Sequence, residues 1–578
     1  MIVELSVASS SSSASLSGST TAPFSAFWLG AWSLALALGW LLPNHYAPWL
    51  AFHFDAWIAG GLATAAAVVI LRSKQPIAVH RFALWCTAAA TIPLFQFWFG
   101  LLPFAGQAWI GAAFVVGLAV SVMLGGYWES VSPGQPMDGL FAAIGTAAIV
   151  SMGLALYQWL GLDIAALDLW VMAMPDIRPY ANFVQPNQLA TFLLWGLLAG
   201  AWGFQRGYIR APVALLMALF VLFGVAMTQS RTAFLAVIGM AMATYAWRRL
   251  WPRKVVWAAA GLAAYFVLCV AALPALSSAL NLNETLGMVA RTETSIRRAG
   301  LMLFVDAAMR APLFGYGWSQ TAVAQLAVAA DHGKLGGIFM HAHNLFLDLV
   351  IWCGVPLGGL LSAAIIYWFI GKTRAVTDAR DAILVTFVGV VGWHAMLELP
   401  LHYAYMLLPT GVVVGVLNSR LSEPVITYWP RWKFAAVWVL ATSLLVVITR
   451  DYLRIEENFY VLRFERARIG SKPTEPPRSV LILDHMNEFL RLGRTPAKRN
   501  MTPDELVWMH KAAYAYPGLA NLFNLATAFA WNGKTWEAQT LVNSLRGVTS
   551  VVQYAQLRGV WQKAAREDAA LAAVSWPE

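Results

Sequence analysis

The side chains in this sequence that could do chemistry stand at the ends of long apolar runs. Two histidines and an asparagine open one such run, in His341-Ala342-His343-Asn344, and Arg231 opens another. Arginine carries a permanent charge and a planar pair of donors that suit the oxygens of a diphosphate. Histidine, with a pKa near neutrality, suits the removal of a proton from a hydroxyl. These residue types predict transfer of a group from a diphosphate donor to a hydroxyl acceptor.

Other polar residues join this set because of their positions. Gln185 and Asn187 precede one apolar run, His394 and Glu398 lie near the end of another, and His402 follows them. His394 and Glu398 are four residues apart, so they share one helix face. For this pair, a structural hydrogen bond between helices is an open alternative to a role in the site.

Three further arginines, Arg291, Arg297 and Arg298, lie in a long polar loop and are candidates to bind phosphate. Each candidate cation also has a structural alternative. Arg297 and Arg298 could solvate an amphipathic helix lying on a membrane, and Arg231 could extend toward lipid headgroups. His343 could be a helix cap.

The elements that hold these residues are predicted to be membrane-spanning helices. Of the 578 residues, 59% are hydrophobic and 12% are charged, whereas a soluble protein has about 25% charged residues. This composition excludes a soluble enzyme and predicts an all-α, polytopic membrane protein in contact with membrane lipids. The net charge of +10 arises from Lys and Arg clusters between apolar runs, a pattern typical of topology signals and not of a nucleic-acid interface. Cys86, Cys269 and Cys353 lie in apolar stretches without CxxC spacing, which argues against a disulfide framework or a zinc site.

Hydropathy predicts about 12–13 spans, each near the roughly 20 residues that cross a bilayer. They lie near 24–42, 56–71, 82–101, 104–125, 138–160, 188–204, 211–228, 232–247, 255–274, 343–370, 382–399, 403–419 and 433–449. The predicted organisation is a disordered tail (1–23), spans one to nine (24–274), a large loop with an amphipathic helix (275–342), spans ten to thirteen (343–450) and a helical domain (451–578).

Loop charge predicts the orientation of these spans. Lys and Arg clusters fall in alternate loops, at 72–81, 206–210, 248–254, 372–380 and 420–433. By the positive-inside rule these loops face the cytoplasm. The candidate residues, the large loop and the C-terminal domain then face the other side, which in a bacterium is the periplasm. Nucleotide sugars and ATP are not available there, so a lipid-linked diphosphate is the donor that fits.

The C-terminal segment contains a pattern of small residues at helical spacing. From Asn524 to Ala538, these small residues are followed by a Gly turn and a second helix start. This pattern resembles one tetratricopeptide unit. A generic helical hairpin fits it equally well.

Four motifs resemble the O-antigen ligase and Wzy polymerase superfamily: Gln185–Ala190, Gln229–Ala233, Gly315-Tyr316-Gly317 and His341–Asn344. The run from Glu398 to Pro409, with the helical tail, is similar more narrowly to the PglL/PilO-type O-oligosaccharyltransferases. The resemblance covers most of residues 180–420. It implies a GT-C-like fold in the bacterial inner membrane, and transfer of a glycan from undecaprenyl diphosphate to Ser or Thr of periplasmic proteins such as pilin.

The resemblance also implies roles for particular residues. The superfamily's essential His, followed by a polar residue, falls on His343-Asn344, and the Gly ten residues past that polar residue falls on Gly354. Leu357 departs from the pattern, which usually has a small or hydroxyl residue there. The superfamily's diphosphate-binding arginines fall on Arg231 and on Arg291, Arg297 or Arg298. Similar enzymes are considered metal-independent, so neither a metal nor a cofactor is expected. His343 would orient or deprotonate the acceptor hydroxyl in a single, inverting displacement.

Three other functions stay open at this point. An O-antigen ligase would use lipid A-core as acceptor, and an O-antigen polymerase would use a second lipid-linked glycan. The helical tail and the Glu398–Pro409 run favour a protein acceptor over both. A transporter of lipid-linked glycans would show charges near mid-span and internal repeats, and neither is evident in the sequence.

Overall fold

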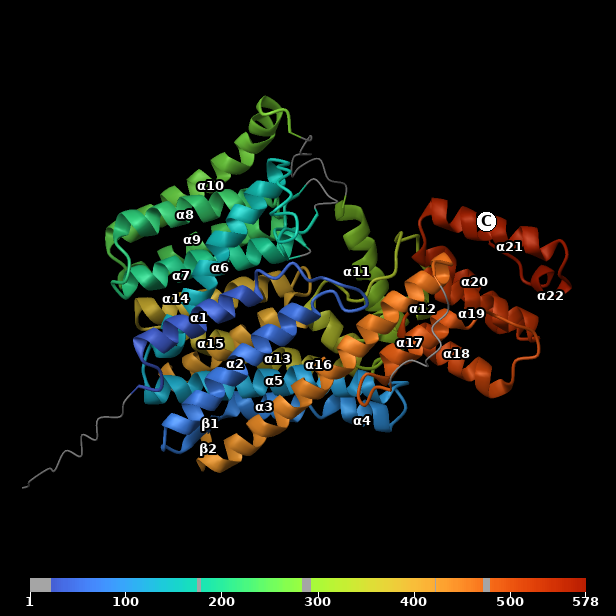
Figure 1. Ribbon diagram of the computed structural model, residues 1–578, viewed down its shortest axis with the longest axis horizontal. Coiled ribbons are helices and arrows are strands. Elements are labelled where there is room, and N and C mark those ends of the chain that lie inside the picture. Colours follow the sequence, from blue (N-terminus) through green and yellow to red (C-terminus); the bar gives the residue numbers. More distant parts are fainter. Residues whose placement is uncertain are drawn as a thin grey trace, which may run out of the picture.

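The computed structural model describes residues 22–173, 178–183, 185–282, 293–421, 423–470 and 479–577, with backbone alone for 293–297. Most of the expected N-terminal tail and Arg291 lie outside these ranges. The described chain is mostly helical and has almost no strand (Figure 1), which confirms the all-α prediction. A two-stranded antiparallel ribbon is the exception, formed by β1 (Ile77–His80) and β2 (Val425–Trp429).

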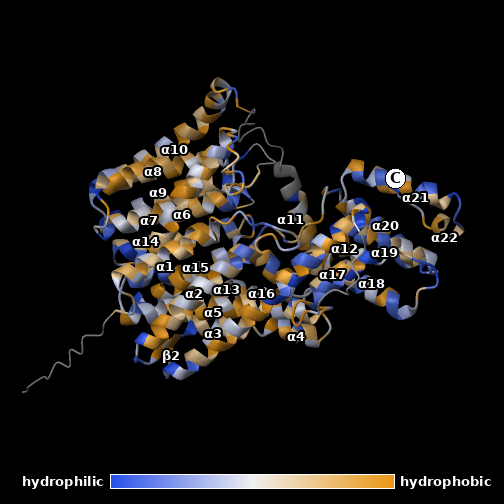
Figure 2. Ribbon diagram, in the orientation of Figure 1, coloured by the Kyte–Doolittle hydropathy of each residue, from blue (hydrophilic) through white to orange (hydrophobic). Residues whose placement is uncertain are grey.

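The membrane part is a bundle of apolar helices. Its members are α1 (Ala26–Gly39), α2 (Phe52–Arg72), α3 (Arg81–Ala89), α4 (Ile92–Trp98), α5 (Ala105–Val131), α6 (Gln135–Trp159), α7 (Pro186–Gln205), α8 (Ala211–Met227), α9 (Arg231–Ala246), α10 (Arg253–Ala279), α13 (Leu345–Arg374), α14 (Ala379–Ala395), α15 (Ala404–Arg420) and α16 (Arg431–Ala467). Among the described residues, six of these helices are long and apolar enough to cross a membrane, namely α2, α5, α6, α10, α13 and α16. The ribbons of α8 and α10 are coloured as hydrophobic along most of their length (Figure 2). Large side chains of these two helices, such as Leu216, Trp257 and Leu268, are exposed. The protein is therefore a multi-pass membrane protein.

One expected span is wrong. The run at 82–101 is not a single helix but two, α3 and α4, of 9 and 7 residues. The break precedes Pro93, which lies in the first turn of α4. Proline has no backbone N–H to continue the ladder of α3, and its ring restricts the residue before it, so the helix ends and restarts.

The remaining helices gather beyond one end of the bundle (Figure 1). The large loop contains α11 (Glu293–Arg310), α12 (Thr321–Val328) and η3 (Ala329–Asp331). The C-terminal helices are α17 (Asp484–Arg494), α18 (Pro503–Ala515), α19 (Leu519–Trp531), α20 (Thr535–Val548), α21 (Val551–Ala565) and α22 (Ala569–Ala572). Helix α16 runs 37 residues, from the bundle toward this domain. Helices α19 and α20 form the expected hairpin, and its turn contains Gly533 at φ +75°.

The C-terminal domain packs directly on the large loop. Gly547 of α20 lies against the backbone of Ala329, so that an added Cβ would clash with the Ala329 carbonyl. The backbone N–H of Leu335 donates to the carbonyl of Gly547 (3.0 Å). The segment after α12 is therefore fixed from its outer side by α20.

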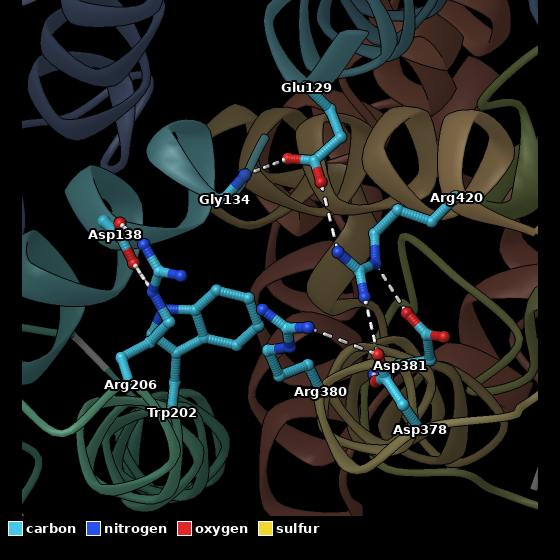
Figure 3. Close-up of polar contacts among 9 residues, drawn as sticks. All are labelled: Glu129, Gly134, Asp138, Trp202, Arg206, Asp378, Arg380, Asp381 and Arg420. Atoms are coloured by element: carbon cyan, nitrogen blue, oxygen red, sulfur yellow. Dashed lines mark hydrogen bonds and ion pairs between the residues drawn. The ribbon is translucent and has the colours of Figure 1, made fainter. Parts of the chain in front are cut away.

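Ion pairs tie the opposite end of the bundle together (Figure 3). The Arg420 guanidinium contacts Asp381 (2.5 Å), Asp378 (3.0 Å) and Glu129 (3.2 Å), which joins α15 to α14 and α5. Separately, Arg206 pairs with Asp138 (2.7 Å), which joins α7 to α6. The pairs of Arg420 with Asp381 and Glu129 are largely buried, and removing one partner of a buried pair costs about 3–5 kcal/mol because the other charge is left without compensation. Arg206 and Arg420 therefore hold helix ends together, in addition to belonging to the basic loop clusters from which the orientation was predicted.

Candidate active site

The polar residues expected to do chemistry lie at the end of the bundle opposite Arg420. Glu398 is at the centre of one group, just beyond the end of α14, and its side chain is 4% exposed. The Gln185 amide donates to Glu398 Oε2 (2.7 Å), and the Asn187 amide donates to Glu398 Oε1. Because Gln185 and Asn187 flank the start of α7, Glu398 joins α7 to the connection between α14 and α15. The sequence predicted all three residues but not their contact.

His394 completes this group from the last turn of α14. Its Nε2 lies 3.5 Å from Glu398 Oε2, and its Nδ1 lies 2.8 Å from the hydroxyl of Thr191 on α7. Burial by itself raises the pKa of Glu398, but hydrogen bonds from His394 and Asn187 and the charge of the nearby His343 lower it below its usual value. Glu398 is therefore an ionised carboxylate within electrostatic reach of His343.

The histidine segment lies directly before α13. His343 has a left-handed backbone, with φ +54°, which is uncommon for a residue with a side chain. Asn344 is the N-cap of α13, since its Oδ1 accepts from the backbone N–H of Leu347 (3.0 Å). The Asn344 amide also donates to the carbonyl of Met396 (3.2 Å). Asn344 thus sets His343 beside the segment that carries Glu398.

His341 packs against His343, with ring centroids 4.2 Å apart. Burial, with the neighbouring His343 and His402, lowers the pKa of His341 to about 2. His341 is therefore neutral at physiological pH and contributes no charge to bind a diphosphate. His402, in the short turn η4 (Pro400–His402), packs on Trp352 with centroids 5.2 Å apart, and burial lowers its pKa to about 4.

A break in α13 lies close to these histidines. Gly354 has φ +78° and ψ 167°, so the helical ladder is interrupted there. The loop at Pro312–Gly317 supplies the missing partners: Tyr316 N–H donates to the Ile351 carbonyl (2.8 Å) and Gly317 N–H to the Trp352 carbonyl (3.1 Å). A Cβ at Gly315 would lie 2.7 Å from the backbone N of Gly354, so the two glycines allow this close approach. The predicted motifs at Gly315–Gly317 and Gly354 are two halves of one backbone contact.

Arg231 is the first residue of α9, and Ser230 is the N-cap of that helix, with its hydroxyl accepting from the Ala233 N–H (3.2 Å). The indole of Trp393, adjacent to His394, donates to the carbonyl of Thr232 (3.2 Å). This contact brings the start of α9 to the end of α14. Arg231 therefore belongs to the same end of the bundle as Glu398.

Of the three candidate arginines of the large loop, Arg298 is the one whose side chain the structure describes. Arg298 lies on α11 and is exposed. Arg297 lies on the same helix, but its side chain is outside the described part of the structure, as is the whole of Arg291. Their expected contact with phosphate stays a prediction.

A cavity of about 800 Å³ opens next to His402 and to Trp393 and Met396 at the end of α14; Arg231, His343 and Glu398 are not among the residues that line it. Residues from Leu345 to Ile370 of α13 line it, together with apolar side chains of α3, α5 and α14. Its polar lining includes Gln320 and His402, and His485 and Tyr516 of the C-terminal domain also contribute to its wall. The cavity therefore extends along much of a membrane helix and reaches the polar end of the bundle.

Sequence reasoning missed several residues that build this region. Thr191 and Gln96 are ordinary polar residues in predicted spans, Thr321 lies in the large loop, and no motif marks any of them. Gln96 donates to the Trp352 carbonyl (2.7 Å) and accepts from the Trp318 N–H (2.8 Å). Gln96 is 7% exposed in a predicted span, and a buried amide of this kind is the available signal for a structural role. Among the described residues, no three His, Cys, Asp or Glu side chains gather as metal ligands.

Comparison with known proteins agrees with this architecture. The chain matches family models described as O-antigen ligase at 214–362, protein glycosylation ligase at 179–202 and the C-terminal part of virulence factor membrane-bound polymerase at 382–563. It is 30% identical over 435 residues to a general O-oligosaccharyltransferase of Acinetobacter baylyi, covering 73% of this chain and 75% of that protein. It is also 28% identical over 258 residues to a ComP-specific O-oligosaccharyltransferase of the same organism, covering 44% and 46% of the two chains.

The helical membrane bundle, its polar end and these matches define a membrane-bound glycosyltransferase. More narrowly, the chain belongs to the PglL-type O-oligosaccharyltransferases of the O-antigen ligase superfamily. The enzyme class predicted from the sequence motifs is therefore confirmed. Proteins of this class perform O-linked glycan transfer from a lipid-linked donor to a protein.

Proposed function

We propose that this enzyme transfers an oligosaccharide from undecaprenyl diphosphate to a Ser or Thr hydroxyl of a periplasmic protein such as pilin. The observation that supports the donor best is the apolar cavity that runs along α13 and reaches His402 at the polar end of the bundle. A polyprenyl chain is apolar along its whole length, so it can pass from lipid into this apolar cavity without being exposed to water. Its diphosphate then lies at the end of the bundle that holds Arg231 and His343.

In the proposed reaction, His343, Glu398 and Arg231 have different roles. The acceptor hydroxyl oxygen attacks the anomeric carbon of the first sugar, and the bond from that carbon to the diphosphate oxygen breaks, with inversion. His343 takes the proton of the hydroxyl. The Glu398 carboxylate favours the protonated form of His343, since opposite charges stabilise each other. Arg231 balances the charge that develops on the leaving diphosphate.

The supporting polar residues hold this arrangement. Gln185 and Asn187 fix the Glu398 carboxylate by donating to its two oxygens. His394 lies between Glu398 and Thr191. His341 and His402 pack beside the reacting groups in neutral form. An arginine of the large loop, among Arg291, Arg297 and Arg298, is proposed to add a second phosphate contact.

The test is a reconstitution of the purified protein in vesicles that contain a lipid-linked glycan. Pilin, lipid A-core or no acceptor is added in three parallel reactions. Glycosylated pilin is the expected product. Glycosylated lipid A-core would instead indicate a ligase, elongated lipid-linked glycan a polymerase, and movement of unreacted donor across the vesicle a transporter. The pilin reaction is expected to survive excess EDTA, and loss that Mg²⁺ restores would contradict the proposed role of the arginines.

Substitution at His343 and Arg231 tests the assignment of roles. A general base contributes about 10²–10⁴-fold, so His343→Ala should abolish most transfer while the melting temperature and donor binding stay near wild type. Arg231→Lys should lose much activity although the charge remains, because a point charge cannot reproduce a bidentate contact. A His343→Ala protein with normal transfer, or an Arg231→Lys protein with wild-type kinetics, would remove that residue from the mechanism.

The side of the membrane is tested with fusions. A reporter active only in the periplasm should work after Ala512 and fail after Arg374. An active fusion after Arg374 would contradict the periplasmic site and the argument for a lipid-linked donor.

A further inference from the structure

A buried chain of hydrogen bonds lies behind the histidine segment. Asp348, in the first turn of α13, is 1% exposed and Thr321, the first residue of α12, is fully buried. Asp348 Oδ1 accepts from the backbone N–H of Ala342 (2.9 Å) and from the Thr321 hydroxyl (2.8 Å). The Thr321 hydroxyl in turn accepts from the indole N–H of Trp352 (2.8 Å). Each of the three donors in this set of hydrogen bonds therefore has an acceptor.

These hydrogen bonds matter for His343 because one of them holds the backbone of the preceding residue, Ala342. Ala342 is the residue between His341 and His343, and it is itself buried. Its N–H points to Asp348, so the peptide on the N-terminal side of Ala342 is fixed to α13. His343 follows with its left-handed backbone, φ +54°. A conformation of this kind is strained and persists only when its surroundings hold it.

We propose that Asp348, held by Thr321, is a positioning residue for His343. It acts by accepting the Ala342 N–H and does not touch the substrate. The proposal rests on the proposed function, because that function gives His343 its role as the base. It also links α12, and through η3 the C-terminal domain, to the geometry of the reacting histidine.

The experiment compares Asp348→Ala with Asp348→Asn in the full-length protein. Asn keeps an oxygen that can accept both hydrogen bonds, whereas Ala leaves the Ala342 N–H without its partner. A misplacement of about 1 Å can cost about 10²-fold in rate, so kcat should fall about 10- to 100-fold in Asp348→Ala. The KM for the lipid-linked donor should stay unchanged in the same protein. Asp348→Asn should recover most of kcat.

Thr321→Val removes the hydroxyl at constant volume and should lower kcat in the same direction. Thr373→Val is the matched control, because Thr373 lies at the far end of α13 and its hydroxyl donates only to Phe369 of its own helix (2.8 Å). An equal loss of kcat in Asp348→Asn and Asp348→Ala would overturn the proposal. It would show that the enzyme needs the ionisable carboxyl group itself and not only an oxygen that accepts the Ala342 hydrogen bond. Normal kcat in Asp348→Ala would also overturn it.

A second measurement does not depend on transfer. Modification of His341 and His343 by diethyl pyrocarbonate, followed by peptide mass spectrometry, reports how firmly the segment is held. Modification should be faster in Asp348→Ala than in wild type and unchanged in Asp348→Asn. If modification is faster in Asp348→Ala but the wild-type protein shows no transfer, the positioning role of Asp348 is supported and the proposed function is contradicted. Transfer that depends on His343 but not on Asp348, with unchanged modification, would support the proposed function and contradict the positioning role of Asp348.

Discussion

Gly354→Ala tests whether the break in α13 is an obligatory part of the structure. At φ +78° and ψ 167°, Gly354 occupies a backbone region that is essentially restricted to glycine. The added methyl would clash with the carbonyl of Leu313 and lie 2.8 Å from the backbone N of Phe314. Backbone atoms cannot rotate away as the end of a side chain can. Either α13 or the Pro312–Gly317 loop must therefore move.

The size of the effect follows from what that movement breaks. Strain at Gly354 accounts for about 1–3 kcal/mol. Three backbone hydrogen bonds join the loop to the break, from Tyr316 N–H, Gly317 N–H and Val355 N–H. Loss of these bonds at about 0.5–1.5 kcal/mol each, added to the strain, gives a total destabilisation of about 2.5–7.5 kcal/mol. Transfer per folded molecule should also fall, because Trp352 and the histidine segment are held by the same part of α13.

Gly359→Ala is the matched control in the same helix. No atom lies within 4 Å of the Cβ added there, and Gly359 has helical geometry. Replacing glycine by alanine at such a site is neutral or stabilises by up to about 1 kcal/mol. The free energy of unfolding is measured by SDS titration of both proteins in the same lipid mixture. Equal stability of the two variants would refute the argument that the break depends on glycine.

Three further outcomes are expected. Glu398→Gln should fold but lose about 10- to 100-fold in transfer rate. This loss corresponds to one charge-assisted hydrogen bond of about 1.5–3 kcal/mol. Transfer at the wild-type rate would show that the carboxylate is not needed. Gly547→Val should lower the melting temperature because the clash with α12–η3 loosens the C-terminal domain, whereas Gly559→Val, with open space around it, should not. His402 has its pKa lowered from 6.5 to about 4, so the unfolded state takes up a proton first and stability falls as pH drops from 6.5 toward 4. His402→Phe should reduce that fall in thermal melts, and an unchanged pH dependence would contradict the assignment.

Hydropathy predicted most of the bundle because a membrane helix must satisfy its own backbone hydrogen bonds. Each expected span except 82–101 contains one main helix, since a long apolar run has no other stable conformation in lipid. The exceptions are local. Pro93 divides one run into α3 and α4, and Gly354 interrupts α13. The second break could not be predicted from its own neighbourhood, because its hydrogen-bond partners lie in a separate loop at Pro312–Gly317.

The candidate site could be predicted as a set of residues but not as a geometry. Gln185 and Glu398 are 213 positions apart, and their hydrogen bond depends on the packing of α7 against α14. His394 and Glu398, by contrast, were paired by their spacing alone, and their contact at 3.5 Å is present. Thr321 and Asp348 carry no motif that links them, because that contact depends on how α12 folds back on α13.

Non-helical backbone at the polar end of the bundle is stabilised by contacts between its own segments. The histidine segment is bound to the α14–α15 connection through Asn344 and the Met396 carbonyl. The break at Gly354 is bound to the Pro312–Gly317 loop, and the intervening Trp352 carries both the Thr321 hydrogen bond and the His402 contact. Irregular backbone at membrane depth persists where it is buried in protein or meets water in a cavity. Because each of these segments supplies partners to another, loosening one should displace the others, and the histidines should respond to changes as far away as α12.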